Sequence, residues 1–290
     1  MKIRIAGIRR CHYYSSNYTD KDSRIFNKTV QYLTEKGFCV TEYSEKEFQN
    51  DTISENFIFS MARNPQSILR LKELEKEGKV VINSGEGVEN CTRDKMISVL
   101  LNHKIPIPKS YIVPTDVNLA FRLEKKLYWI KRSDSHSIEK EDVVFIEDQT
   151  EIEKTLQSFS KRNIPLAVIS EHIEGDLIKF YGIKDSDFFF WFYPEELNHS
   201  KFGLEEINGK TQGLAFNLEE LKKLSNDSAK VLNVDIYGGD CVVDSNGNIK
   251  IIDFNDWPSF APCLDKAASQ IAEYIFNTVN NKKTQASNLI

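Results

Sequence analysis

The chain contains 290 residues, 40% of them hydrophobic and 28% charged, with a formal net charge of −5 at pH 7. That length can bury a large core and form two or three domains. The acidic balance argues against nucleic acid as a partner. No run reaches the roughly 18 apolar residues of a membrane span, and charges interrupt the N-terminal run MKIRIAGIRRC, so we expect neither a membrane partner nor a signal peptide.

The five cysteines are scattered, and no two of them form a CxxC pair: they are Cys11, Cys39, Cys91, Cys241 and Cys263. An odd number without paired spacing argues against a disulfide framework or a zinc site and is typical of a reducing compartment. We therefore expect the protein to be cytoplasmic.

Up to residue 83, runs of strand length alternate with segments of helical period. Strands are predicted over residues 3–8, 38–43, 57–61 and 80–83, and helices over 20–36 and 65–78. This alternation predicts a small parallel α/β domain. Ligands of such sheets lie at the carboxyl ends of strands, so loops 9–17 and 63–65 are candidate substrate loops. Arg9, Arg10, His12 and Arg63 could hold a small anionic substrate there, or the loops could simply be basic and solvated.

The second part of the chain opens with a predicted helix over residues 92–103. A proline-broken segment over 105–108 follows, which indicates a domain boundary. Strands are predicted over 128–133, 143–147, 166–173, 177–183 and 187–193, and helices over 151–161, 218–232 and 261–280.

Between the last two helices, the strands Asp240–Asp244 and Ile249–Asp253 flank a polar linker that is typical of a hairpin turn. If the hairpin closes symmetrically, Asp240 lies opposite Asp253, and Asn255 shares a face with Asp253. Three oxygen ligands at one sheet edge favour Mg²⁺ or Mn²⁺, which would take its other ligands from nucleotide phosphates and water. The alternative is an ordinary hairpin with two solvated aspartates.

Four motifs follow one another in a recognisable order. They are Arg93-Asp94-Lys95, Trp129-Ile130-Lys131, the hinge Ser170–Asp176 reading SEHIEGD, and Asp240 followed by Asp253-Phe254-Asn255. In this order the chain, over roughly residues 83–276, resembles the ATP-grasp superfamily. The resemblance implies an α/β fold in which an N-terminal Rossmann-like domain precedes two α+β subdomains that clamp ATP. We place the domains at residues 1–90, 91–173 and 174–290.

The resemblance also implies roles for individual residues. Lys95 and Lys131 match the lysines that reach the nucleotide phosphates, and the backbone of Glu171, His172 and Ile173 matches the hinge that pairs with adenine. The apolar run Leu166–Ile169 would supply walls for the purine. Asp176, or alternatively Glu174, matches the residue that holds the ribose. Asp240, Asp253 and Asn255 match the magnesium ligands.

One departure concerns the loop that covers the phosphates. It is usually rich in glycine, whereas segment 133–139, reading SDSHSIE, contains none. Hydroxyls and a histidine would have to replace its backbone N–H donors, or the loop would approach the phosphates less closely. His136 is a candidate for contact with phosphate or substrate.

Two chemistries occur on this fold. Most members resemble carboxylate–amine ligases that form an acyl phosphate, whereas a smaller branch, the inositol trisphosphate 5/6-kinases, phosphorylates an alcohol. The serine–histidine loop and Lys179-Phe180-Tyr181 resemble the kinase branch. No arginine follows Arg162 to cover an acyl phosphate, although Lys179, or Arg63 from the N-terminal domain, could act there.

We expect an ADP-forming ligase, with a kinase as the alternative and a non-catalytic nucleotide-binding module as the second. Lys179, Arg63 and His136 are the candidate catalytic residues, and ATP with Mg²⁺ or Mn²⁺ are the expected cofactors. A homodimer is possible on this fold, but no residue specifies its interface.

Overall fold

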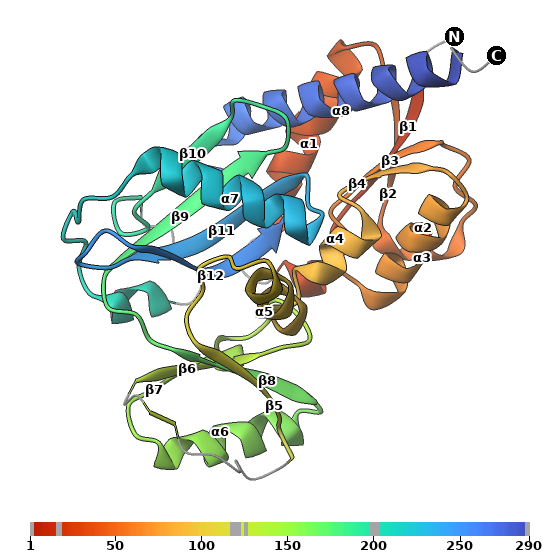
Figure 1. Ribbon diagram of the computed structural model, residues 1–290. Helices are drawn as coiled ribbons and strands as arrows, with labels where there is room; N and C mark the ends of the chain where they lie inside the picture. The colour runs from red at the N-terminus through yellow and green to blue at the C-terminus, as the bar shows by residue number, and fades with distance from the viewer. Residues whose placement is uncertain (1–2, 16–18, 117–122, 125–126, 198–202, 288–290) are drawn as a thin grey trace.

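Three four-stranded sheets follow one another along the chain in a computed structural model that describes residues 3–15, 19–116, 123–124, 127–197 and 203–287 (Figure 1). The predicted mixed α/β fold class is confirmed. Within the described residues, no helix combines the length and the apolar character needed to cross a membrane.

The first sheet is parallel, with strand order β2-β1-β3-β4. Its strands are β1 (Arg4–Ile8), β2 (Cys39–Tyr43), β3 (Phe57–Ser60) and β4 (Val80–Ile82), and its helices are α1 (Thr19–Glu35), α2 (Glu45–Asn50), α3 (Pro65–Lys76) and α4 (Gly85–Asn90). The sequence analysis missed α2, although Ser44 and Glu47 form a capping box at its start. It also missed α4, a short helix whose two glycines weaken the helical signal.

Helix α5 (Arg93–Asn102) leads into the second sheet, which is antiparallel with the order β5-β8-β6-β7. Its elements are β5 (Ser110–Pro114), β6 (Tyr128–Arg132), β7 (Val143–Ile146), α6 (Thr150–Lys161) and β8 (Leu166–Glu171). Helix α6 packs on the face of this sheet that lies away from the other two sheets (Figure 1).

The third sheet is antiparallel, with the order β10-β9-β11-β12. Its elements are β9 (Asp176–Ile183), β10 (Phe189–Phe192), the 3₁₀ helix η3 (Leu204–Asn208), α7 (Leu218–Leu232), β11 (Ile236–Val243) and β12 (Ile249–Asp256). A last helix, α8 (Leu264–Ser287), runs back and packs against α1 of the first domain (Figure 1).

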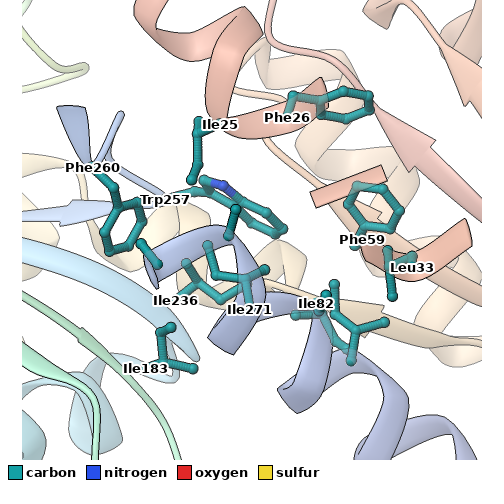
Figure 2. Close-up of a cluster of buried hydrophobic side chains, with 14 of the residues drawn as sticks. Ile25, Phe26, Leu33, Phe59, Ile82, Ile183, Ile236, Trp257, Phe260 and Ile271 are labelled. Carbon is teal, nitrogen blue, oxygen red and sulfur yellow. The ribbon is translucent and has the colours of Figure 1, made fainter. Parts of the chain in front are cut away.

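A shared apolar core joins the first and third sheets. Figure 2 shows Trp257, which directly follows β12, between Ile25 and Phe59 of the N-terminal domain and Ile236 and Ile271 of the C-terminal part. The indole is fully buried and stacks on Phe59 with ring centroids 5.9 Å apart. Burial of this size fixes the end of β12 against the carboxyl edge of the first sheet.

Candidate active site

A cavity of about 270 Å³ lies where the three sheets meet, near the lower end of the range for small-molecule sites. Each domain contributes ionisable side chains to it. From the first domain come Arg10, Asp22 and Arg63, from the second Lys131, His136 and Glu171, and from the third Lys179, Glu205, Asp240 and Asp253. Most of the predicted site residues therefore surround a single cavity.

Asp240 pairs with Asp253 as predicted, but the rest of the hairpin departs from the symmetric register that was expected, because a β-bulge shifts the pairing by one residue from Cys241 onward. Gly239 allows the close approach of the strands beside this pair, because a Cβ atom there would lie 2.7 Å from the carbonyl oxygen of Asp253. Asn255 follows on the same strand and also lines the cavity. The three predicted oxygen ligands are thus brought to one place.

A β-bulge next to Asp240 shapes the wall of the cavity beside Lys131. Asp240 pairs with Asp253 but Cys241 pairs with Ile251, so Ile252 has no partner on β11. Its carbonyl oxygen accepts a hydrogen bond of 3.1 Å from Lys131 Nζ. The bulge thereby fixes the lysine beside the hairpin, as bulges next to binding sites commonly do.

Asp253 is held in its ionised form. Burial alone would raise its pKa, but the positive charges of Arg93 and Lys131 outweigh burial and lower the pKa to about 2. Arg93 Nη2 lies 3.4 Å from Asp253 Oδ2. This carboxylate is therefore available as a ligand over the whole neutral range.

Asp240 has a different environment. Burial raises its pKa, and the ammonium group of Lys179 opposes that effect. Lys179 faces Asp240 across the β9–β11 ladder, at 3.0 Å from Oδ2, and lies 3.4 Å from Glu205 of η3. The lysine is therefore shared between two carboxylates at the cavity wall.

The donor set fits a hard divalent cation. No group of three or more His, Cys, Asp or Glu that could hold a metal forms among the described residues. The set here is instead two facing carboxylates and one amide, all oxygen donors, which fits Mg²⁺ bound together with phosphate oxygens and not a metal cage made by protein alone.

Of the three hinge residues expected to pair with adenine, one offers a backbone donor that is free among the described residues. The N–H groups of Glu171 and His172 bind the carbonyl oxygens of Lys109 and Leu127 at 2.9 and 3.1 Å. The N–H of Ile173 makes no hydrogen bond in the part of the chain that the structure describes. Hinge pairing with adenine would therefore use Ile173 N–H together with a neighbouring carbonyl group.

Three features differ from the sequence-based expectations. Lys95 lies outside the cavity lining and pairs with Glu89 at 2.8 Å, because its helix turns it outward. Asp176 also lies outside the lining, and its two oxygens accept the N–H groups of Gln212 and Leu214, each at 2.7 Å. Residues 166–169 pack into the cores beneath the sheet, and the apolar walls are instead formed by Pro108, Trp129, Val143, Leu177, Val242 and Ile252.

The predicted substrate loops contribute two arginines. Arg10 and Arg63 line the cavity, whereas Arg9 pairs with Glu42 and His12 is exposed beside Thr19. Part of the predicted loop, residues 16–17, lies outside the described residues. Of the four basic residues considered, two therefore reach the cavity.

Both arginines bind Asp256, a fully buried carboxylate that the sequence analysis did not single out. Arg63 Nε lies 2.9 and 3.2 Å from its two oxygens, and Arg10 Nη2 lies 3.5 Å from Oδ2. His136 Nε2 completes the set at 3.0 Å from Oδ1. Nη1 of Arg63 makes no hydrogen bond among the described residues, so it can bind a ligand.

His136 is neutral at physiological pH. Burial and the charge of Arg63 lower its pKa to about 4, although Asp256 acts in the opposite direction. A carboxylate only accepts hydrogen bonds, so the proton of the neutral ring must be on Nε2. The loop that carries His136 is thereby tied to the C-terminal sheet.

Sequence reasoning missed several residues of this site, and for four of them the available signals differ. Arg93 and Trp129 stand inside quoted motifs, each two residues before the lysine that received the role. Asp256 directly follows Asn255, so the sequence could have placed it at the same edge of the sheet but could not have shown its partners. Glu205 belongs to a polar stretch without periodicity, and no signal pointed to it.

No protein-family model and no curated protein matches the sequence. Solved structures match over nearly the whole chain. A D-alanine–D-alanine ligase from Bacillus anthracis in complex with ATP has a TM-score of 0.67 and 14% identity, with 97% of this chain and 99% of that chain covered. D-alanyl-alanine synthetase A from Vibrio cholerae gives 0.68 and 11%, covering 97% and 98%. The ATP-grasp ligase PsnB in complex with a minimal precursor gives 0.59 and 13%, covering 96% and 99%.

At identities this low, the structural matches establish the fold of this chain but not the reaction that it catalyses. The three sheets, the cavity between them and the hairpin at its wall agree with these full-length matches. The chain therefore has the ATP-grasp fold.

Proposed function

We propose that the protein is an ATP-dependent, ADP-forming ligase that activates a small carboxylate as an acyl phosphate for attack by an amine. The observation that carries this proposal is one cavity that joins three groups of side chains. Lys131 stands on the phosphate side, the oxygen donors of the β11–β12 hairpin form one wall, and Arg10 and Arg63 enter from the N-terminal domain.

The arginines remove the main objection to a ligase. The chain has no arginine after Arg162 that could cover the oxygens of an acyl phosphate. Arg63 reaches the cavity from the loop after β3 and keeps Nη1 without a partner among the described residues. A guanidinium group at this point can bind a substrate carboxylate and then the acyl phosphate formed from it.

In the proposed reaction a carboxylate oxygen attacks the γ-phosphorus of ATP, and ADP leaves. The amine then attacks the acyl carbon, and inorganic phosphate leaves. Lys131 would stabilise phosphate oxygens, and Lys179, opposite Asp240, would stabilise the transferring phosphoryl group. A divalent cation bound to Asp240, Asp253 and Asn255 would neutralise charge on the phosphates.

A kinase is the second candidate because the loop that resembles the kinase branch also lines the cavity. Ser137 and His136 both face it. An alcohol could therefore receive the phosphoryl group beside a neutral imidazole that can accept a proton.

The deciding experiment measures ADP release from Mg-ATP with pooled amino acids, other carboxylates and polyol phosphates, with and without hydroxylamine. A ligase should yield ADP together with a hydroxamate, because hydroxylamine traps the acyl phosphate. A kinase should yield ADP and a phosphomonoester without hydroxamate. Formation of AMP would contradict both mechanisms, and the variant Asp253→Ala serves as the inactive control.

A further inference from the structure

The loop of residues 133–137, of which His136 and Ser137 line the cavity, has no glycine, and its hydroxyl groups are already engaged or buried. Ser135 Oγ donates to the carbonyl oxygen of His136 at 3.1 Å, and Ser137 Oγ accepts from Arg93 at 2.8 Å. Ser133 Oγ is buried and has no partner within the described part of the chain. Two of the three hydroxyls therefore make contacts around the loop itself, and the replacement of backbone donors by hydroxyls and a histidine stays a prediction.

The backbone of the loop has N–H groups that are not used within the described part of the chain. At its two ends the N–H groups are used: Ser133 binds the carbonyl of Leu166, and Ile138 and Glu139 bind Asp142 Oδ2. Between them, the N–H groups of residues 134–136 make no hydrogen bond among the residues that the structure describes. Successive backbone N–H groups of this kind form anion-binding concavities.

The side chain of Arg93 holds this loop through several hydrogen bonds. Arg93 is the first residue of α5, and its side chain is only 5% exposed. Nη1 donates to the carbonyl oxygens of Arg132 and Ser135 at 3.1 and 3.3 Å. Nη2 donates to Ser137 Oγ, and it also lies 3.4 Å from Asp253 Oδ2. One guanidinium group therefore connects both ends of the loop to the metal-binding hairpin.

We propose that Arg93 is a positioning residue that holds the loop 133–137 in the conformation in which its backbone N–H groups bind the nucleotide phosphates. This inference rests on the proposed function, since it assumes that the ligand is a nucleoside triphosphate. A glycine-rich loop reaches such a conformation through backbone freedom. Here the same result would come from a planar group that contacts two carbonyls and a hydroxyl at fixed positions.

A lysine at position 93 cannot contact both carbonyl oxygens and the hydroxyl at once. Its ammonium group is a single point on a flexible stem, whereas the contacts of Arg93 are divided between two nitrogens of a rigid fork. The variant Arg93→Lys therefore keeps the charge and removes most of the geometry. The matched control is Arg70→Lys on α3, where an arginine outside the cavity lining also donates to a backbone carbonyl, that of Asp51.

The experiment combines calorimetric binding of Mg-ATP and of AMP with hydrogen–deuterium exchange of the nucleotide-free protein. In Arg93→Lys, the affinity for Mg-ATP should fall about tenfold or more. A loss of this size is expected because binding must then order the backbone of at least one loop residue that Arg93 no longer holds in place. AMP affinity should change by less than about threefold, because only the β- and γ-phosphates lose the loop. Amides of residues 133–139 should exchange at least about tenfold faster. Arg70→Lys should change none of these.

Two results would overturn the inference while leaving the proposed function standing. One is wild-type Mg-ATP affinity in Arg93→Lys, which would mean that charge alone is sufficient. The other is weak binding with unchanged loop exchange, which would mean direct contact of Arg93 with phosphate. If the wild type itself does not bind Mg-ATP, both proposals fail. If Arg93→Lys does not fold, Ser137→Ala replaces it: a smaller loss of the same pattern is expected, and no change refutes the inference.

Discussion

Removal of the Asp256 carboxylate should strongly destabilise the protein. This side chain is fully buried and is the partner of Arg63 at 2.9 Å, of Arg10 at 3.5 Å and of His136 at 3.0 Å. In Asp256→Asn, Arg10 still has Asp22 at 3.0 Å, but Arg63 keeps only the backbone carbonyl of residue 256, at 2.8 Å. A buried cation without its counter-charge costs about 3–5 kcal/mol.

Urea unfolding followed by circular dichroism measures this loss, and Arg63→Met supplies the second corner of a double-mutant cycle. The double variant should be less destabilised than the sum of the single variants by about 2 kcal/mol or more, because the unpaired cation is gone. Asp227→Asn is the control, since its pair with Lys223 is exposed (77% and 44%) and should contribute below about 0.5 kcal/mol. A loss under about 1 kcal/mol for Asp256→Asn with additive single effects would refute this reasoning.

Four further outcomes are expected. Lys131→Ala should weaken Mg-ATP binding, measured by calorimetry, about tenfold or more, because it removes a cation that is fixed beside the hairpin. Lys282→Ala, at an exposed lysine, should change the affinity less than about twofold. Equal effects of the two variants would contradict the assignment of Lys131 to the nucleotide phosphates. Asp253→Ala should lower turnover about 10²–10³-fold while the circular dichroism spectrum stays native; retained activity would exclude it as a metal ligand. His136 has a pKa of about 4 in the folded protein and about 6.5 in the unfolded chain, so between these pH values the unfolded state binds more protons. The free energy of unfolding that His136 contributes above pH 6.5 is therefore lost as the pH falls to 4. That loss, up to about 3 kcal/mol, should be absent in His136→Asn during denaturation at several pH values. Chelation with EDTA should weaken ATP binding at least about tenfold, and unchanged affinity would argue against a metal-bound nucleotide.

The fold was largely predictable because its signals are local. The alternation of strands and helices predicted the first sheet, and the polar turn after Asp244 predicted the hairpin and its Asp240–Asp253 pair but not the β-bulge beside that pair. Alternation along β12 put Asp253 and Asn255 on one face. The sequence could not show how the sheets meet, since Trp257 contacts Phe59 across 198 positions of chain and no local pattern reports such a contact.

The site was predictable in its residue types but less so in its partners. Lys131 and the hairpin ligands come from short motifs with fixed spacing, and the structure brings them together. Arg93 and Lys95 are both on the first turn of α5, and only helix orientation decides which of the two faces the cavity. That orientation is set by tertiary packing. The motif alone therefore indicated Lys95, whereas Arg93 is the residue that lines the cavity.

Charge balance explains why the proposed nucleotide site would need a divalent cation. The described charged side chains that line the cavity are five cations, Arg10, Arg63, Arg93, Lys131 and Lys179, and five carboxylates, Asp22, Glu171, Glu205, Asp240 and Asp253. Asp256 adds a sixth carboxylate beneath them. The lining as a whole therefore does not attract a triphosphate by net charge, although single cations stand in the right places. A divalent ion between the facing carboxylates of the hairpin would neutralise them and release Lys179 for the transferring phosphoryl group. Under the proposed function the metal and the lysine would therefore have related tasks: both would offset Asp240, and binding of the metal would free the lysine for the phosphoryl group.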